Sequence, residues 1–199
     1  YRTNAQSRAL EESFLRYALR YPLVGGTRVS QRREVKDALA DLRTLRNDHD
    51  VAAFERIVNG PPRGNGQRSL EALRALAEDR DSDYWGALAA VADGAGELTT
   101  RARNALIGFR TLLERLRTRV GLMALPELLD TELEESGSRA MLMDGSHDGE
   151  DRWGTLIELR EEVDRYGDLE PADALDRLLE ETAQVADQDA NAGDADKVT

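Results

Sequence analysis

Cysteine is absent from this 199-residue chain. Its absence excludes disulfides, thiolate nucleophiles and cysteine-ligated zinc. Aromatic residues make up only 5% of the sequence. No run of about 18 apolar residues is present that could cross a membrane. We therefore expect a cytoplasmic protein without a membrane partner. Because the chain opens at Tyr1 rather than at a methionine, we also expect a fragment of a longer protein.

Recognisable catalytic patterns are also missing. His49 and His147 lie in Asp-rich stretches without a second histidine at ligand spacing, so we interpret both as solvated loop residues. The acidic cluster of Asp148, Glu150 and Asp151 lacks the alternation of a calcium loop, and we interpret it as a solvated loop. No G-x-x-x-x-G-K-[ST] phosphate loop occurs. The sequence thus predicts no catalytic residue, no metal site and no cofactor in this chain.

The net charge of −12 hides an uneven distribution. Residues 1–80 contain 15 Lys and Arg against 11 Asp and Glu, whereas residues 81–199 contain 12 against 28. A polyanion should therefore bind the first part of the chain. On charge alone, however, we favour the interpretation that the acidic helical surfaces only aid solubility.

Helical periodicity recurs along the chain, and alternating β-branched runs are nearly absent. The pattern predicts an all-α, compact domain of about eight helices on short loops. One set of apolar residues is predicted to be buried together: Leu106, Phe109, Leu113, Leu116, Leu156, Leu159 and Val163. Residues 186–196 offer no apolar side chain larger than Ala, so we expect the acidic C-terminal tail, residues 186–199, to be a flexible linker.

A glycine-rich segment stands immediately before a predicted helix that runs through Leu70, Leu73 and Leu76. Glycines let backbone N–H groups approach a ligand, and a helix N-terminus favours an anion. The segment is either a phosphate-binding turn or an ordinary helix–helix connection. As a phosphate site it would use Gly64, Asn65, Gly66, Arg63, Arg68, Ser69, Lys36 and Arg43. Contacts to phosphate alone would be indifferent to base sequence.

These residues, together with the N-terminal segments, resemble the UvrD/PcrA/Rep-type superfamily 1 DNA helicases. The resemblance rests on Tyr1 to Arg8 (YRTNAQSR), Tyr21-Pro22, Val24 to Arg28 (VGGTR), Arg32 to Leu39 (RREVKDAL) and Pro62 to Gly66 (PRGNG). It is specific over residues 1 to about 80 and rests on length and helix content beyond them. It implies that residues 1–24 are a remnant of the 2A motor domain, residues 25–185 the helical 2B subdomain, and residues 186–199 a linker returning towards 2A.

The resemblance further implies a parent 3'-5' DNA helicase that uses ATP and Mg in DNA repair or replication, with its ATP site outside this chain. Arg2 and Asn4 would contact single-stranded DNA in that parent. The Gly64-Asn65-Gly66 turn would contact duplex DNA or a single-strand/duplex junction. The implied protein partners are the other helicase subdomains and repair or transcription proteins.

Four positions depart from the family pattern: Val29, Ser30, Asp41 and Asn65. All four lose apolar or aromatic character, which suggests either natural drift or an exposed surface made more polar. Two other interpretations remain open. One is a protein-interaction or autoinhibitory module with negligible DNA binding in isolation. The other is a small metal-assisted hydrolase built on the acidic cluster at residues 148–151.

Overall fold

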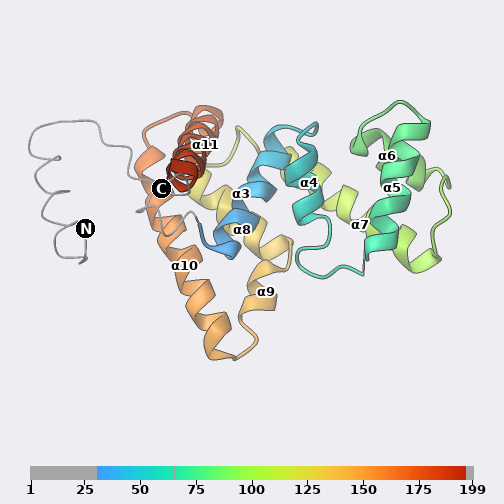
Figure 1. Cartoon of the computed structure of the whole chain (residues 1–199). Coiled ribbons are helices and arrows are strands. Elements are labelled where there is room, and N and C mark those ends of the chain that lie inside the picture. Colours follow the sequence, from blue (N-terminus) through green and yellow to red (C-terminus); the bar gives the residue numbers. More distant parts are fainter. Residues whose placement is uncertain (1–30, 65, 196–199) are drawn as a thin grey trace, which may run out of the picture.

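The computed structural model describes residues 31–64 and 66–195, which form helices and turns but no strand (Figure 1). The all-α prediction is confirmed. Nine α-helices and one short 3₁₀ helix, η1, make up this described part: α3 (Arg33–Arg46), α4 (Val51–Ile57), α5 (Gln67–Asp79), α6 (Tyr84–Ala92), α7 (Thr100–Arg117), α8 (Leu125–Glu135), α9 (Ser138–Leu142), α10 (His147–Val163), η1 (Asp164–Tyr166) and α11 (Pro171–Ala195).

Helix α7 joins two parts of the molecule (Figure 1). Its C-terminal half lies with α3, α4 and α8 to α11, which together form the main body. Its N-terminal half extends to α5 and α6, which form a distal lobe at the far end from α10 and α11. The connection between α4 and α5 therefore runs from the main body to the distal lobe, and the candidate site lies on this connection.

The predicted core is confirmed. All seven residues that the periodicity assigned to it are at most 2% exposed: Leu106, Phe109, Leu113, Leu116, Leu156, Leu159 and Val163. They belong to one continuous cluster of buried side chains that also includes Phe54 and Tyr84. The Phe54 ring stacks on Tyr84 with centroids 4.7 Å apart and meets Phe109 edge-on at 5.7 Å. These rings join the main body to the distal lobe through apolar contact.

Several helices begin where a polar side chain accepts a hydrogen bond from a first-turn amide, the usual N-cap arrangement. The accepting side chains are those of Asp50, Asp83, Thr99 and Ser146, and the donating amides are those of Ala53, Gly86, Ala102 and Gly149, respectively. The last of these caps corrects a prediction. Because Ser146 caps α10, His147, Asp148, Glu150 and Asp151 lie in the first turns of that helix rather than in a loop. Acidic residues are favourable there, since the helix dipole is positive at its N-terminus.

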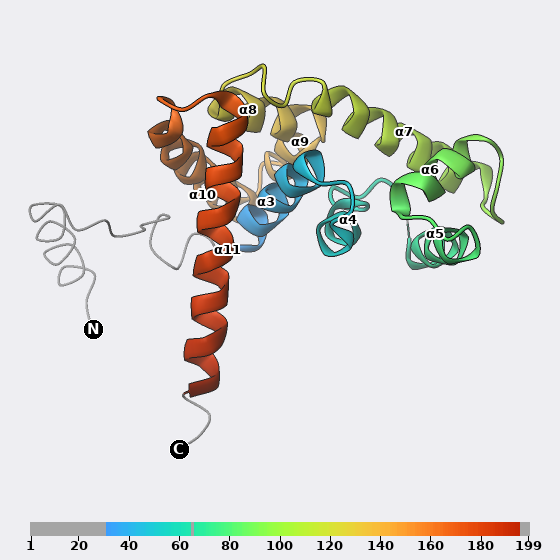
Figure 2. The ribbon, with the colours of Figure 1, turned by 90° about the horizontal axis from the view of Figure 1, so that it is seen from above.

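The C-terminal region gives a second correction. Residues 186–195, predicted to begin a flexible linker, continue α11 to Ala195, and Figure 2 shows this helix extending past the main body. The first part of α11 is anchored by the buried Leu175, Leu178 and Val185. Once a helix is nucleated, each further residue adds a hydrogen bond at little cost, and an Ala-rich segment propagates it well. Within the described residues, no helix has the length and apolarity that a membrane span requires.

Candidate functional site

The connection between α4 and α5 is held in place by the Arg63 side chain. Its two terminal nitrogens donate to four backbone carbonyls: Nη1 to Ile57 (3.2 Å), Gly60 (2.7 Å) and Pro61 (3.2 Å), and Nη2 to Ser136 (3.1 Å). The guanidinium carbon also lies 5.1 Å from the centre of the Phe109 ring. Arg63 was predicted to contact phosphate. In the structure its two terminal nitrogens donate to internal carbonyls, and the contact with phosphate stays a prediction.

Gly64 occupies the exposed part of the same connection. Its φ of +82° lies in the left-handed region, which glycine adopts without steric cost. A Cβ at this position would lie 3.4 Å from Nε of Arg101, so the Arg101 guanidinium lies directly against the Gly64 backbone. Arg101 comes from the first turn of α7 and is exposed. The fold thus adds to the predicted turn a cation that the sequence analysis did not identify.

Gly66 is the N-cap residue of α5 and has no side-chain cap. Its carbonyl accepts from the amides of Ser69 (2.9 Å) and Leu70 (3.3 Å), while no backbone carbonyl in the described ranges accepts from the amides of Gln67 and Arg68. A Cβ at Gly66 would meet nothing within 4 Å, so the approach to this helix end is open. The Ser69 side chain, in contrast, is buried. The predicted contact of Ser69 with duplex DNA stays a prediction.

Arg68 and Arg101 differ from most arginines of the protein. Both are exposed, and neither makes a hydrogen bond or ion pair with another described residue. Arg103, in contrast, has partners within the protein, because its guanidinium caps the C-terminal end of α6. It donates to the carbonyls of Val91 (2.7 Å), Ala95 (3.0 Å) and Gly96 (3.0 Å). The turn is thus flanked by two cations available to an external anion.

One signal in the sequence pointed to Arg101. Basic residues in the first turn of a helix oppose the helix dipole, so their presence there calls for a local reason. Arg103 has such a reason in its three carbonyl partners, and Arg101 has none within the described residues. What the sequence cannot supply is the position of Arg101 beside Gly64, since only the packing of α7 brings the two together.

The other predicted phosphate contacts, Lys36 and Arg43, lie on α3. Lys36 donates from Nζ to Gln31 Oε1 at 2.6 Å, and Arg43 is half-buried on α3. Neither makes a hydrogen bond or ion pair with residues 60–64 or 66–69 in the structure as described. Arg2, Asn4 and Asn65 lie outside the described residues, and so do Val29 and Ser30.

Below the turn, two carboxyl groups are buried close to Arg63. Asp41 on α3 is 5% exposed and Glu132 on α8 is 1% exposed. Burial, followed by the charge of Glu132, holds the pKa of Asp41 well above its usual value. Burial raises the pKa of Glu132 to about 7. Because Asp41 is buried, the hypothesis of a more polar exposed surface does not apply to it.

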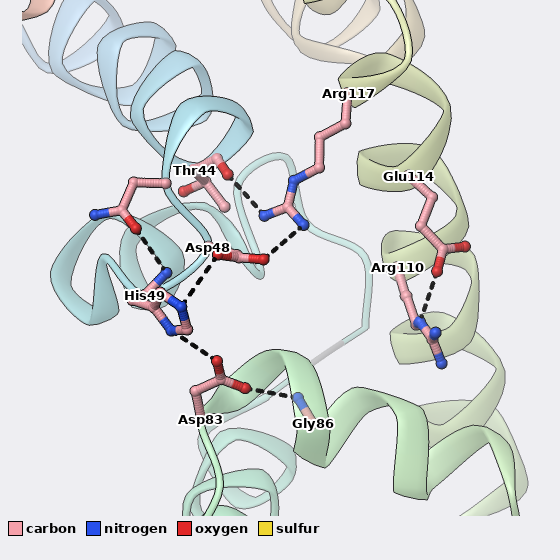
Figure 3. A network of polar contacts seen from close by, with 9 residues as sticks. Thr44, Asp48, His49, Asp83, Gly86, Arg110, Glu114 and Arg117 are labelled. Carbon is pink, nitrogen blue, oxygen red and sulfur yellow. Dashed lines mark hydrogen bonds and ion pairs between the residues drawn. The ribbon is translucent and has the colours of Figure 1, made fainter.

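A polar network connects the main body to the distal lobe (Figure 3). Arg117 on α7 donates to the carbonyl of Thr44 (2.9 Å) and to Asp48 (3.3 Å), and its guanidinium lies 3.9 Å from the Trp85 ring centre. His49 is exposed, as predicted. Its Nδ1 nevertheless lies 2.8 Å from Asp83 Oδ2, a contact with the distal lobe that the sequence did not indicate.

The residues considered as a possible metal site lie at the N-terminus of α10 and are exposed. Asp151 pairs with His147 at 3.3 Å, and Asp148 pairs with Arg152 at 3.8 Å. Among the described residues, no group of three or more His, Cys, Asp or Glu side chains is arranged to hold a metal ion.

Comparison with known proteins identifies relatives along most of the chain. Residues 1–82 match the family model described as the UvrD-like helicase C-terminal domain. The chain is 40% identical over 160 residues to DNA helicase II of Haemophilus influenzae, an alignment that covers 80% of this chain and 22% of the relative. It is 41% identical over 141 residues to DNA helicase II of Escherichia coli, covering 71% of this chain and 19% of the relative.

A third relative extends the similarity almost to both ends. The ATP-dependent DNA helicase PcrA of Leuconostoc citreum is 35% identical over 196 residues, which is 95% of this chain and 26% of the relative. The chain thus spans about a fifth to a quarter of the length of these curated relatives.

Proposed function

Since this chain is related to the UvrD/PcrA-type DNA helicases over most of its length, we propose that it is an accessory duplex-DNA-binding and regulatory subdomain of such an enzyme. The whole protein would be an ATP-dependent 3'-5' DNA helicase acting in repair or replication. ATP and Mg would bind outside these residues, because the sequence has no phosphate loop for nucleotide.

The observation that carries the DNA-binding part of the proposal is the cationic turn. Three kinds of group lie along one stretch of surface: an exposed glycine backbone, two amides at the start of α5 and the guanidiniums of Arg68 and Arg101. Neither the amides nor the guanidiniums have a partner among the described residues. The amides and the guanidiniums donate hydrogen bonds and accept none. DNA phosphates offer only acceptors and negative charge, so the two chemistries are complementary. Because no base edge is involved, binding would be independent of sequence.

The acidic remainder of the chain limits the affinity. Residues 81–199 carry an excess of 16 negative charges, which repel DNA from the surfaces that these residues form. Few cations meet the phosphates, so binding would be weak and sensitive to salt. The same acidic helices support a second candidate, a protein-interaction or autoinhibitory module whose acidic surface faces a basic partner.

Removal of Arg101 distinguishes these candidates. Arg101→Ala is expected to weaken binding to a labelled hairpin with a single-stranded tail several-fold, and to lower the salt dependence by roughly one counterion. Fluorescence anisotropy at low and moderate salt measures both. Arg80→Ala is the matched control, because Arg80 is likewise exposed and unpaired among the described residues but lies at the other end of α5.

Equal loss of affinity in the two variants would show a diffuse charge effect and contradict a site at the turn. Absence of binding by the unchanged chain at low salt would favour the protein-interaction candidate instead.

A further inference from the structure

The packing around Arg63 brings together two sets of acceptors for one guanidinium. Four backbone carbonyls, three from residues 57–61 and one from Ser136, accept its hydrogen bonds. The carboxyl groups of Asp41 and Glu132 lie near enough to act on its charge without taking part in those hydrogen bonds. Arg63 thus has neutral partners while two acids lie buried close by.

Burial opposes the ionised form of Glu132, and the nearby side chains of Ser136, Asp41 and Arg63 favour it to a smaller extent. Within the described part of the chain, neither oxygen of Glu132 accepts a hydrogen bond. An unpaired carboxylate costs several kcal/mol to bury, so such a group takes up a proton instead. Asp37 adds a further negative charge to the surroundings of Asp41.

Several charged side chains on α3, on α8 and on the elements packed against them form pairs of their own: Arg56–Asp37 (2.7 Å), Arg152–Glu34 (3.6 Å), Arg160–Asp130 (3.3 Å) and Arg46–Asp176 (2.6 Å). Among the described residues, Arg63 is the cation whose charge acts on both buried carboxyl groups.

We propose that Arg63 is the positioning residue of the Gly64 turn and that a proton held by the buried Asp41–Glu132 pair keeps it in that role. While the proton is present, the guanidinium stays on the four carbonyls and fixes the backbone that leads into Gly64. When the proton leaves, two buried carboxylates attract the guanidinium away from the carbonyls, because charge-assisted hydrogen bonds are about twice as strong as neutral ones. The turn then loses its anchor to Ser136.

The inference rests on the proposed function in one respect, since DNA binding at the turn would fall as the pair ionises. The burial of Glu132 raises its pKa to about 7, and burial likewise raises the pKa of Asp41. The protons of a coupled pair leave in steps that belong to both groups. The change is therefore expected across the neutral pH range.

The test combines a readout of the turn with a readout of DNA binding, both on the whole chain. NMR follows the carboxyl carbon of Glu132 and the backbone amides of Gly64 and Gly66 from pH 5.5 to 8.5. Both glycine amides are expected to shift with the midpoint of Glu132. In Glu132→Gln those shifts are expected to disappear. Glu127→Gln, which removes an exposed carboxylate from the first turn of the same helix, should behave as the unchanged chain.

Hairpin binding is then compared at pH 6 and pH 8.5. At least a five-fold loss at the higher pH is expected for the unchanged chain and for Glu127→Gln, against less than two-fold for Glu132→Gln. Glycine amides that do not follow Glu132 would overturn the inference, and so would a pH-dependent loss that persists in Glu132→Gln. Linked amide shifts without any DNA binding would uphold the positioning role and reject the proposed function.

Two further variants keep the test decisive. Asp41→Asn removes the other carboxyl and is read in the same way if circular dichroism shows that Glu132→Gln does not fold. Arg63→Lys keeps the charge but lacks the planar fork that spans several carbonyls, whereas Arg101→Lys keeps a charge that needs only to face phosphate. Binding is expected to fall several-fold in the first and less than two-fold in the second. The reverse order would identify Arg63 as a phosphate contact.

Discussion

Leu113 lies on the face of α7 that points into the core, and its side chain is 1% exposed. Leu113→Ala is expected to lower the free energy of unfolding by about 2 to 5 kcal/mol, from lost transfer energy and the cavity left behind. Chemical denaturation monitored by circular dichroism measures this change. Leu122→Ala is the control, because Leu122 is 80% exposed. Similar losses in the two variants would contradict the packing described for α7.

Glu132 gives the protein a stability that depends on pH. Its pKa in the folded state is about 7, raised from 4.5 by burial, so the folded protein holds this proton more tightly than the unfolded chain. The resulting stabilisation is fully present below about pH 4.5 and is lost as the pH rises through 7. The expected loss is on the order of 3 kcal/mol.

Denaturation at pH 5 and pH 8 tests this expectation. In Glu132→Gln the difference between the two pH values is expected to shrink, because an amide does not titrate. The depressed pKa values of Glu55 and Asp176, which follow from their hydrogen bonds to Tyr84 and to Arg46, act below this range. An unchanged difference in the variant would show that other groups carry the pH dependence.

The buried acids also show where residue-level prediction fails. Periodicity identifies Leu39 and Leu42 as core residues because an apolar side chain gains from burial wherever the core lies. Asp41 on the same helix is buried too, and its residue type predicts the opposite. Its environment is made by Glu132 and Arg63, which come from other segments. No local pattern contains that information.

At the scale of elements, the contact between the distal lobe and the main body depends on Arg117. Its guanidinium joins the end of α3 to Trp85 through a carbonyl, a carboxylate and an aromatic face. Arg117→Ala is expected to lower the free energy of unfolding by about 1 to 3 kcal/mol and to expose Trp85 to solvent. Acrylamide quenching in a Trp153→Phe background measures the exposure of Trp85.

Arg110→Ala provides the comparison for this prediction. Arg110 also approaches the Trp85 ring, at 5.8 Å, but pairs with Glu114 on the surface of α7 rather than with the end of α3. A smaller effect, below about 1 kcal/mol, is expected for an exposed i,i+4 pair. If Arg110→Ala exposes Trp85 as much as Arg117→Ala does, the link through Arg117 is not what holds the lobe.

Prediction at this scale succeeded for helix positions in the core and failed at two helix ends. The start of α10 was missed because Asp and Gly residues around 145–151 suggest a loop, although Ser146 supplies a cap. The end of α11 was missed because residues 186–195 lack large apolar side chains, and anchoring by Val185 and earlier residues allows propagation. Both errors underestimate how far a helix extends once its first turns are capped or packed against the core.

At the scale of the whole molecule, the sequence predicted the fold class and the glycine turn, while the composition of the site came from the structure. Gly64 could be predicted from its place before a helix. Arg101 lies beside it only through the packing of α7, and the carbonyl of Ser136, from a distant segment, holds the Arg63 side chain. Relatives at 35% to 41% identity confirm the family resemblance without testing any single contact.

Helix α7 carries Leu113 and Leu116 in the main core and Arg101 at the glycine turn. The distance along the helix from Arg117 to Arg101 is about 24 Å at 1.5 Å per residue. The C-terminal half of α7 is fixed in the core, so a tilt of the helix about that half displaces its N-terminal end. A tilt of about 5° moves the Arg101 end by about 2 Å, enough to make or break a hydrogen bond to phosphate. Under the proposed function, small changes in core packing would in this way alter the contact between Arg101 and DNA.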